Sequence, residues 1–324
     1  MDAKTEGRMR LTLLGGFLGS GKTTWLRHQL HEGRFRNAYI IVNEAAEMPV
    51  DDVLLGGAIR LSVLSGGCVC CSGKADLIAL LRKLCDEGSK SDTSNLPINE
   101  IILETSGLAD PGPIVEAIRA DPMLVHHIVV GEIIVAVDAL HGMSQLRREA
   151  LGRRQTEIAD YLIVTKVDEA DDPELLKLLA ALKRLNPGAG ITGAVKGSPY
   201  PLPDAAGVEP EELPPISGET ARAQIFPVVL DIDHTIDWTA LTVWLSALLH
   251  ARGDDVLRVK GVIRTPAGRL LLQSVRKVMQ SPEILPEQDN DERRRDNMLI
   301  VIGSGYQPDD LMRSLRYFAG AGKT

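Results

Sequence analysis

The chain has 324 residues and a formal net charge of −8, with 44% hydrophobic and 25% charged residues. This length suits two domains, and the composition is ordinary for a globular protein. No apolar run approaches the roughly 20 residues that span a bilayer, and the first residues lack the apolar core of a signal peptide. A negative net charge also disfavours a nucleic-acid surface. From these three observations we expect a cytoplasmic protein with neither membrane nor nucleic-acid partners.

Strand-like apolar runs alternate with helical patterns through the first two-thirds of the chain. This alternation predicts an α/β fold with a mostly parallel sheet, helices on both faces, and ligands at the carboxyl ends of the strands. Strands are predicted at 11–14, 39–42, 59–64, 101–104, 133–137 and 162–165, and helices at 22–30, 75–85, 113–120 and 173–185.

A proline-rich stretch at 201–221 is typical of an extended linker and separates a first domain, 1–200, from a second, 222–324. The second domain is predicted to be a small α+β unit with its helices on one face of a sheet, in an order close to the ferredoxin-like plan. Its strands are predicted at 225–230, 256–263, 269–275 and 298–302, and its helices at 238–251 and 308–318.

A glycine-rich segment joins the first predicted strand to the first predicted helix and fits the phosphate-binding loop pattern. Its glycines let backbone N–H groups close on phosphate oxygens, and the positive end of the helix points at the same place. Lys22 can reach the β- and γ-phosphates, and the Thr23 hydroxyl can ligate Mg²⁺. The predicted nucleotide-binding residues of this loop are Gly16, Gly19, Ser20, Gly21, Lys22, Thr23 and Thr24.

A second motif, Thr165-Lys166-Val167-Asp168, follows a predicted strand and resembles the guanine-specificity motif Asn-Lys-x-Asp with threonine in the first place. The Asp168 carboxylate can accept hydrogen bonds from both N1–H and the 2-amino group of guanine, a donor pair that adenine lacks. The stem of Lys166 can lie along the plane of the base. Thr165, Lys166 and Asp168 are therefore predicted to bind the base of GTP or GDP.

A third motif, Glu104-Thr-Ser-Gly107, stands in the place of the second switch, where many GTPases carry Asp-x-x-Gly. Glu104 can hold Mg²⁺ directly or through water, and Gly107 allows a backbone N–H to approach the γ-phosphate. The alternative is a carboxylate that caps the following turn. Lys22, Thr23, Glu104 and Gly107 are the predicted catalytic residues.

Three cysteines, Cys68, Cys70 and Cys71, follow two glycines and a predicted strand. Three thiolates on a tight turn suit Zn²⁺, and a carboxylate or an imidazole could complete a tetrahedron. Glu47 is the favoured oxygen ligand, because its loop and the cysteine loop should leave the same edge of a parallel sheet. A redox thiol and a buried cluster are the alternatives, and Cys85, within a helical pattern, is predicted to be a buried small hydrophobe.

Together these motifs resemble the CobW-type metallochaperone GTPases of the CobW/HypB/UreG group. The resemblance rests on 16–24, 67–71, 104–113 and 165–168, and extends into the second domain at 257–263, 271–273 and 299–303. It implies a P-loop fold of the SIMIBI class and slow, Mg²⁺-dependent hydrolysis of GTP to GDP. It further implies delivery of a transition metal to a client metalloprotein, and it leaves a nucleotide- or metal-dependent homodimer open.

Zinc is the default cargo because three thiolates suit it, whereas delivery of cobalt or iron to a cobalamin or catabolic enzyme stays open. A metal-sensing module that GTP merely stabilises is the alternative function. The stretch 43–47 reads Asn-Glu-Ala-Ala-Glu where the family has Asn-Glu-Phe-Gly-Glu, and the lost glycine stiffens a loop expected to move with nucleotide. The chain also lacks the His-rich tract of some members, which favours delivery of metal over storage.

Overall fold

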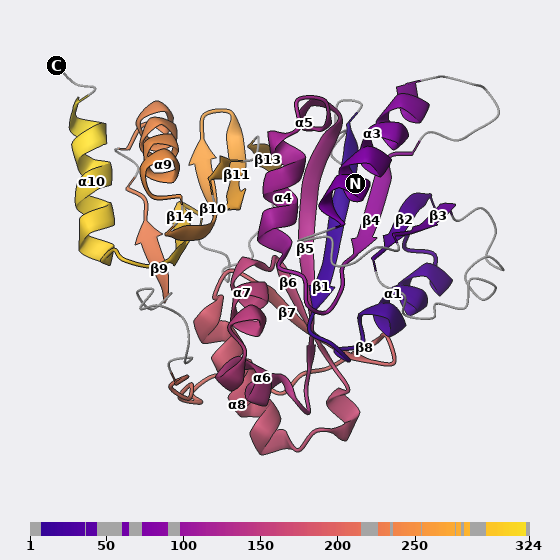
Figure 1. The fold of residues 1–324 in the computed structure, drawn as a ribbon. Helices are drawn as coiled ribbons and strands as arrows, with labels where there is room; N and C mark the ends of the chain where they lie inside the picture. The colour runs from indigo at the N-terminus through magenta and orange to yellow at the C-terminus, as the bar shows by residue number, and fades with distance from the viewer. Residues whose placement is uncertain are drawn as a thin grey trace. The chain divides into compact units, whose positions relative to one another are not determined.

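The computed structural model of the protein describes residues 8–35, 37–43, 60–64, 73–89, 98–214, 226–233, 236–253, 255–275, 277–279, 282–285 and 296–321. Figure 1 shows the ribbon. The chain divides into two compact units, one formed by Met1–Arg184 and Ala189–Ile216 and the other by Leu185–Gly188 and Ser217–Thr324. Among the described residues, no helix is both long enough and apolar enough to cross a membrane.

The described part of the first unit is built on an eight-stranded sheet with the strand order β3-β2-β4-β1-β5-β6-β7-β8. Neighbouring strands from β3 to β7 run parallel, and β8 is antiparallel to β7. The strands are β1 (Met9–Gly16), β2 (Ala38–Val42), β3 (Arg60–Val63), β4 (Glu100–Glu104), β5 (Ile128–Asp138), β6 (Tyr161–Thr165), β7 (Gly190–Val195) and β8 (Ser198–Tyr200).

Helices cover both faces of this sheet. Alternate residues of a strand point to opposite faces, and both sets are buried on β1, where Leu14 packs in the cluster that contains α1 while Leu11 and Leu13 are also buried. On the other side, α7 contacts β1 and β5, and α4 contacts α3 and α7 (Figure 1). The helices are α1 (Lys22–His31), α3 (Lys74–Ser89), α4 (Pro111–Ala120), α5 (Leu124–His127), α6 (Gly142–Arg148), α7 (Ala150–Ile158) and α8 (Asp172–Leu185), with a 3₁₀ turn η1 (Val167–Glu169). The predicted mostly parallel sheet with helices on both faces is confirmed.

The carboxyl ends of four parallel strands are joined by backbone hydrogen bonds at one edge of the sheet. The N–H of Thr105, after β4, donates to Leu14 O on β1 at 2.9 Å, and the N–H of Asn43, after β2, donates to Glu104 O at 2.9 Å. The N–H of Leu64, after β3, donates to Val42 O at 2.9 Å. The segments that follow β1, β2, β3 and β4 therefore start side by side.

Cys85 lies on α3, and the prediction that it is buried is confirmed. Burial, with a smaller contribution from the carboxylates of Asp86 and Asp121, raises the pKa of its thiol to about 11. This thiol is therefore protonated near neutral pH and unsuited to nucleophilic or metal chemistry.

Residues 201–214 are the described part of the predicted linker, and two of them, Glu211 and Pro214, contact helices of the first unit. Arg147 at the end of α6 forms a bidentate ion pair with Glu211, and Arg153 of α7 donates from Nη2 to Pro214 O at 2.6 Å. The same Arg153 side chain donates from Nε to Leu146 O at 2.6 Å. This stretch is thus fixed by side-chain hydrogen bonds although it contains neither helix nor strand.

The second unit contains a sheet of antiparallel strands in the order β12-β11-β10-β14-β9, with β13 also pairing to β11. Two helices, α9 (Trp238–Arg252) and α10 (Pro308–Ala321), pack in one core with residues of β9, β10, β11 and β14, as the predicted one-faced arrangement requires. A ferredoxin-like sheet has two parallel central strands, and every described pair here is antiparallel, so the order differs from that plan. The strands are β9 (Phe226–Asp231), β10 (Val256–Thr265), β11 (Gly268–Val275), β12 (Val278–Met279), β13 (Glu283–Leu285) and β14 (Met298–Gly303).

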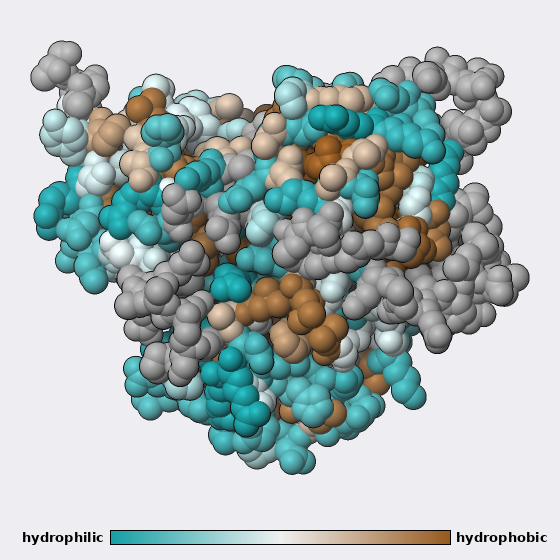
Figure 2. Space-filling model, in the orientation of Figure 1, coloured by the Kyte–Doolittle hydropathy of each residue, from teal (hydrophilic) through white to brown (hydrophobic). Residues whose placement is uncertain are grey.

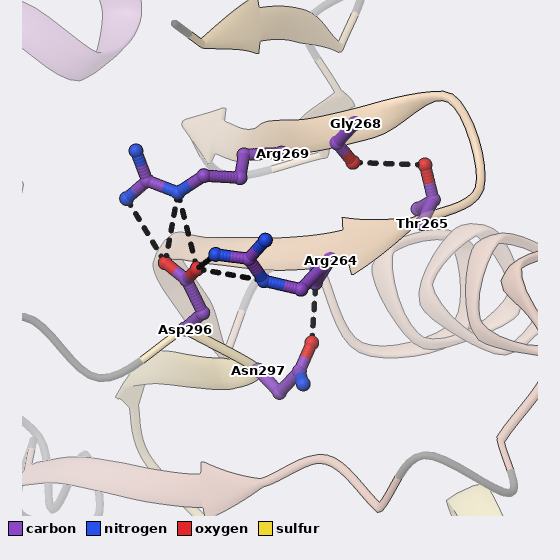
Figure 3. Close-up of polar contacts among 6 residues, drawn as sticks. All are labelled: Arg264, Thr265, Gly268, Arg269, Asp296 and Asn297. Carbon is purple, nitrogen blue, oxygen red and sulfur yellow. Dashed lines mark hydrogen bonds and ion pairs between the residues drawn. The ribbon is translucent and has the colours of Figure 1, made fainter. Parts of the chain in front are cut away.

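Asp296 binds Arg264 and Arg269, the two arginines on either side of the turn between β10 and β11 (Figure 3). Arg269 donates from Nη2 at 2.9 Å and from Nε at 3.1 Å, and Arg264 donates from Nη2 at 2.7 Å. The neighbouring Asn297 accepts the backbone N–H of Arg264 on its side-chain oxygen at 2.8 Å. The hydrogen bonds from Arg269, opposed by burial and reinforced by Arg264, hold the pKa of Asp296 below its ordinary range.

We expect Asp296→Asn to lower the free energy of unfolding of this unit by about 3 kcal/mol at pH 7, because Arg269 is buried and loses its charged partner. The folded-state pKa of Asp296 lies below the unfolded value of about 3.9, so its stabilising effect is complete above that pH and is lost as the pH falls through the folded pKa. Chemical denaturation of both proteins at pH 7 and at steps below pH 4 measures this. The exposed Asp310→Asn variant is the control, and a difference that does not shrink in acid would contradict the prediction.

Candidate functional site

The phosphate loop connects β1 to α1 with three glycines in a backbone region that side chains avoid. Gly16, Gly19 and Gly21 have φ angles of +135°, +72° and +81°. A Cβ atom at Gly16 would also collide with the carbonyl oxygen of Ala136 on β5 and lie 2.7 Å from Ser20 Oγ. The pattern recognised in the sequence therefore corresponds to a loop that this chain builds only with glycine at these places.

Lys22 projects from the first turn of α1 back into this loop. Its Nζ donates to Gly16 O and to Phe17 O, each at 3.0 Å, and the residue is only 8% exposed. The ammonium group thus lies inside the curve of the loop, at the positive end of a helix. Both features favour a bound phosphate.

Thr23 and Glu104 meet beside the same loop. Thr23 Oγ1 donates to Glu104 Oε1 at 2.5 Å, and Glu104, at the carboxyl end of β4, is 4% exposed. A hydroxyl and a carboxylate oxygen are the ligand types that Mg²⁺ takes alongside the phosphates of a nucleotide. The two predicted magnesium ligands, 81 positions apart in the sequence, therefore converge on one point and fit this ion.

The segment after Glu104 touches the phosphate loop. A Cβ atom at Gly107 would lie 2.6 Å from Leu18 N and 2.8 Å from Leu18 Cα, so the close approach of the two backbones requires glycine. The exposed side chains of Leu18 and Leu108, at 46% and 54%, belong to these two segments. Figure 2 shows hydrophobic residues in the middle of the face of the molecule that it draws, and hydrophilic residues over α6 and α8.

Helix α7 contacts the segment that follows Glu104 through two side chains. Gln155 is buried and donates from Nε2 to Ala109 O at 2.8 Å, and Arg154 pairs with Asp110 at 3.4 Å. Asp110 in turn accepts the N–H of Gly112 at 2.9 Å and caps α4. The support from Gln155 was missed in the sequence, where a glutamine within a polar helix carries no signal.

The predicted base-binding motif lies directly against the phosphate loop. Thr165 Oγ1 donates to Ser20 O at 2.9 Å, which gives a physical role to the threonine that replaces the usual asparagine. Lys166 has a left-handed backbone with φ of +56°, and its Nζ donates to Asp138 Oδ2 at 2.6 Å. Asp168 lies on the following 3₁₀ turn and is exposed.

The four predicted transition-metal ligands, Cys68, Cys70, Cys71 and Glu47, lie outside the described residues. The residues that lead to them are described: Asn43 is buried, and its Nδ2 donates to Leu64 O at 3.5 Å. Within the part of the chain that the structure describes, no three His, Cys, Asp or Glu side chains are grouped closely enough to hold a metal ion.

An ion pair joins the helix after the cysteine loop to the segment that follows α4. Arg82 of α3 donates to Asp121 Oδ2 from Nε at 2.9 Å, and Asp121 Oδ1 accepts the N–H groups of Met123 and Leu124, each at 3.0 Å. Burial alone would raise the pKa of Asp121, but the hydrogen bonds from Leu124, Arg82 and Met123 outweigh it and lower the pKa. Asp121 is therefore ionised near neutral pH and ties α3 to α4 and α5.

Two family models match this chain. The CobW/HypB/UreG nucleotide-binding domain matches residues 10–192, and the cobalamin synthesis protein cobW C-terminal domain matches residues 227–319.

Similar proteins include the zinc chaperone YjiA of Escherichia coli K12, which is 32% identical over 97% of this chain and 98% of its own length. The zinc chaperone CobW of Pseudomonas aeruginosa is 29% identical over 86% of this chain and 83% of its own. Among solved structures, a zinc-bound triple variant of the YjiA GTPase superposes with a TM-score of 0.64 at 25% identity, covering 96% of this chain and 99% of that one. The family recognised in the motifs is confirmed: this chain belongs to the CobW/HypB/UreG family of P-loop proteins and carries the CobW C-terminal domain.

Proposed function

We propose that this protein is a GTP-hydrolysing metallochaperone that binds a transition metal, zinc by preference, and delivers it to a client metalloprotein. One observation carries the proposal. The side chain of Glu104 binds Thr23 of the phosphate loop, while its backbone oxygen accepts the N–H of Asn43, where the chain enters the Glu47 loop. A single residue therefore links the nucleotide site to the start of the candidate metal loop.

In the nucleotide site, Lys22 offsets negative charge on the transferred phosphoryl group, and Gly107 offers its backbone N–H to the γ-phosphate. Thr23 and Glu104 hold Mg²⁺, which neutralises charge on the β- and γ-phosphates when bound. Asp168 reads guanine, beside Thr165 and Lys166. Leu108 directly follows Gly107, so no amide side chain is available there to orient water, and we expect slow turnover.

In the metal site, Cys68, Cys70 and Cys71 supply thiolates and Glu47 supplies an oxygen. The family relatives named as zinc chaperones support zinc as the cargo. We propose 1–200 as the GTPase domain that contains both sites, 201–221 as the connection, and 222–324 as the second domain.

The adjacency of the strand ends supports coupling between the two sites. Because β1, β2, β3 and β4 are joined by hydrogen bonds at their carboxyl ends, a shift of Glu104 on nucleotide exchange reaches Asn43 directly and Leu64 through Val42 and Asn43. We expect about a 5–150-fold difference in zinc affinity between the GTP-analogue and GDP forms, and the coupling must be reciprocal.

A competition titration with a chromophoric zinc chelator tests the proposal. Serine variants of Cys68, Cys70 and Cys71 should each weaken zinc binding in both nucleotide states, and binding should weaken as the pH falls because thiolates must form. Cys85→Ala is the matched control, since that buried thiol is protonated and should not bind metal. Equal zinc affinity in both nucleotide states would contradict the switch, and unchanged affinity in all three serine variants would contradict the site.

A further inference from the structure

A buried carboxylate, Asp138, ends β5 next to the base-binding motif. It is 1% exposed, and its strand position pairs with Thr165 of β6. Both of its oxygens are engaged: Oδ1 accepts the N–H of Leu140 at 2.8 Å, and Oδ2 accepts Lys166 Nζ at 2.6 Å. Burying a charge is unfavourable unless it is paired, so the position of Lys166 is closely tied to that of Asp138.

Lys166 is constrained at both ends of its side chain. Its backbone is left-handed, a conformation that residues other than glycine adopt only when their surroundings hold them there. Its ammonium group is fixed on Asp138, so the aliphatic stem between them has a set direction. Two residues further on, Asp168 occupies the 3₁₀ turn that Lys166 begins.

The neighbouring contacts place Thr165 between the Asp138–Lys166 pair and the phosphate loop. The N–H of Ala139 donates to Thr165 O at 3.0 Å, and Thr165 Oγ1 donates to Val137 O at 3.3 Å and to Ser20 O at 2.9 Å. A change at Asp138 therefore acts directly on Lys166 and the turn that carries Asp168. It is separated from the phosphate loop, which contains Lys22 and Thr23, by the hydrogen bond from Thr165 to Ser20.

We infer that Asp138 is a positioning residue for base recognition, which holds Lys166 and its turn in the shape that presents Asp168 and the lysine stem to guanine. The inference rests on the proposed GTP-binding function. Asp138 does not touch the base in this account; it acts through Lys166. A turn that is already fixed in the free protein loses less conformational entropy when the nucleotide binds.

The variant Asp138→Asn keeps the shape and an acceptor for the N–H of Leu140 but removes the charge that faces Lys166. We expect it to weaken binding of GDP about 10- to 100-fold, the range for a lost charge-assisted hydrogen bond. The effect should be on affinity and KM for GTP, with kcat at saturating GTP within a few-fold of the original, because the groups on the phosphates are untouched. Calorimetric titration with GDP and steady-state hydrolysis of GTP measure the two quantities.

The matched control is Asp160→Asn. Asp160 is an equally buried aspartate on the same strand pair, where its Oδ2 accepts the N–H of Ile133 at 2.9 Å, but it lies at the amino end of β6. It should leave GDP affinity unchanged even if the melting temperature falls. Equal losses of GDP affinity in both variants would reduce Asp138 to a structural residue.

Asp138→Asn leaves the charge of Lys166 opposite a neutral amide, and this variant could fail to fold. The double variant Asp138→Asn/Lys166→Gln removes both charges and keeps the inference testable in that case. If Asp138 acts through Lys166, the double variant binds GDP no more weakly than Lys166→Gln alone; a further loss would overturn the inference. Asp168→Asn is measured in the same series. Unchanged GTP affinity there would remove the guanine assignment itself, whereas a loss there without one in Asp138→Asn would overturn only the inference.

Discussion

Lys22→Ala is expected to reduce GTP hydrolysis by at least about 100- to 1,000-fold, because electrostatic stabilisation of the phosphoryl group is most of what such a site contributes. The Lys22 ammonium is held in the phosphate loop by the carbonyl oxygens of Gly16 and Phe17, and alanine removes this positive charge from the loop. Release of inorganic phosphate at saturating GTP and Mg²⁺ measures the loss.

The control for this experiment is Lys177→Ala, which removes an exposed lysine paired with Glu174 on α8 and should hydrolyse GTP at the original rate. Thr23→Ala is a useful companion, since it acts through the metal and should be partly rescued by a higher Mg²⁺ concentration, whereas Lys22→Ala should not. Full hydrolysis by Lys22→Ala would mean that the activity belongs to another site or to a contaminant.

Most of the sheet of the first unit could be predicted because its central strands are buried on both faces, whereas β7 and the exposed edge strand β8 were missed. Runs such as 101–103 and 162–164 are continuously apolar, and a chain that alternates such runs with helical patterns has few other ways to bury them. The phosphate loop could also be predicted from the sequence. Gly16 and Gly21 have positive φ angles, which require glycine, and both lie within six positions of Lys22, so the motif is local in the sequence.

The helix α7 could not be predicted because most of the side chains that it buries are polar. Gln155, Thr156 and Glu157 are all buried beside Ile158, so the buried face of the helix is largely polar and a hydrophobic periodicity argument does not detect it. Its role depends on a hydrogen bond from Gln155 to Ala109, 46 positions away. Such pairings follow from tertiary structure and leave no local trace.

The role of Asp138 was hidden for the same reason. In the sequence it is only the polar residue that ends an apolar run, and its partner Lys166 is 28 positions further on. The strand order of the second sheet also could not be predicted from the sequence, because six antiparallel strands can be arranged in several ways that bury the same residues. Only the register shows that β10 lies between β11 and β14.

Asp168→Asn is expected to weaken GTP binding by about 2–4 kcal/mol, because the carboxylate that we propose as the acceptor of two guanine donors is replaced by an amide that can accept only one. The same change should create affinity for xanthosine triphosphate. Xanthine keeps N1–H but carries a carbonyl oxygen at C2, and the asparagine side chain can accept from the first and donate to the second. Because Asp168 is exposed on its 3₁₀ turn, we expect Asp168→Asn to fold as the original protein does.

The measurement is a competition titration of GTP, xanthosine triphosphate and ATP against a fluorescent GDP analogue, for the original protein and for Asp168→Asn. Glu169→Gln, an exposed change on the same 3₁₀ turn, is the control and should leave the order of preference unchanged. A reversal of preference from GTP to xanthosine triphosphate, with ATP weak throughout, identifies Asp168 as the residue that reads the base. If the original protein binds ATP as tightly as GTP, or if Asp168→Asn loses all three nucleotides equally, the guanine assignment is wrong.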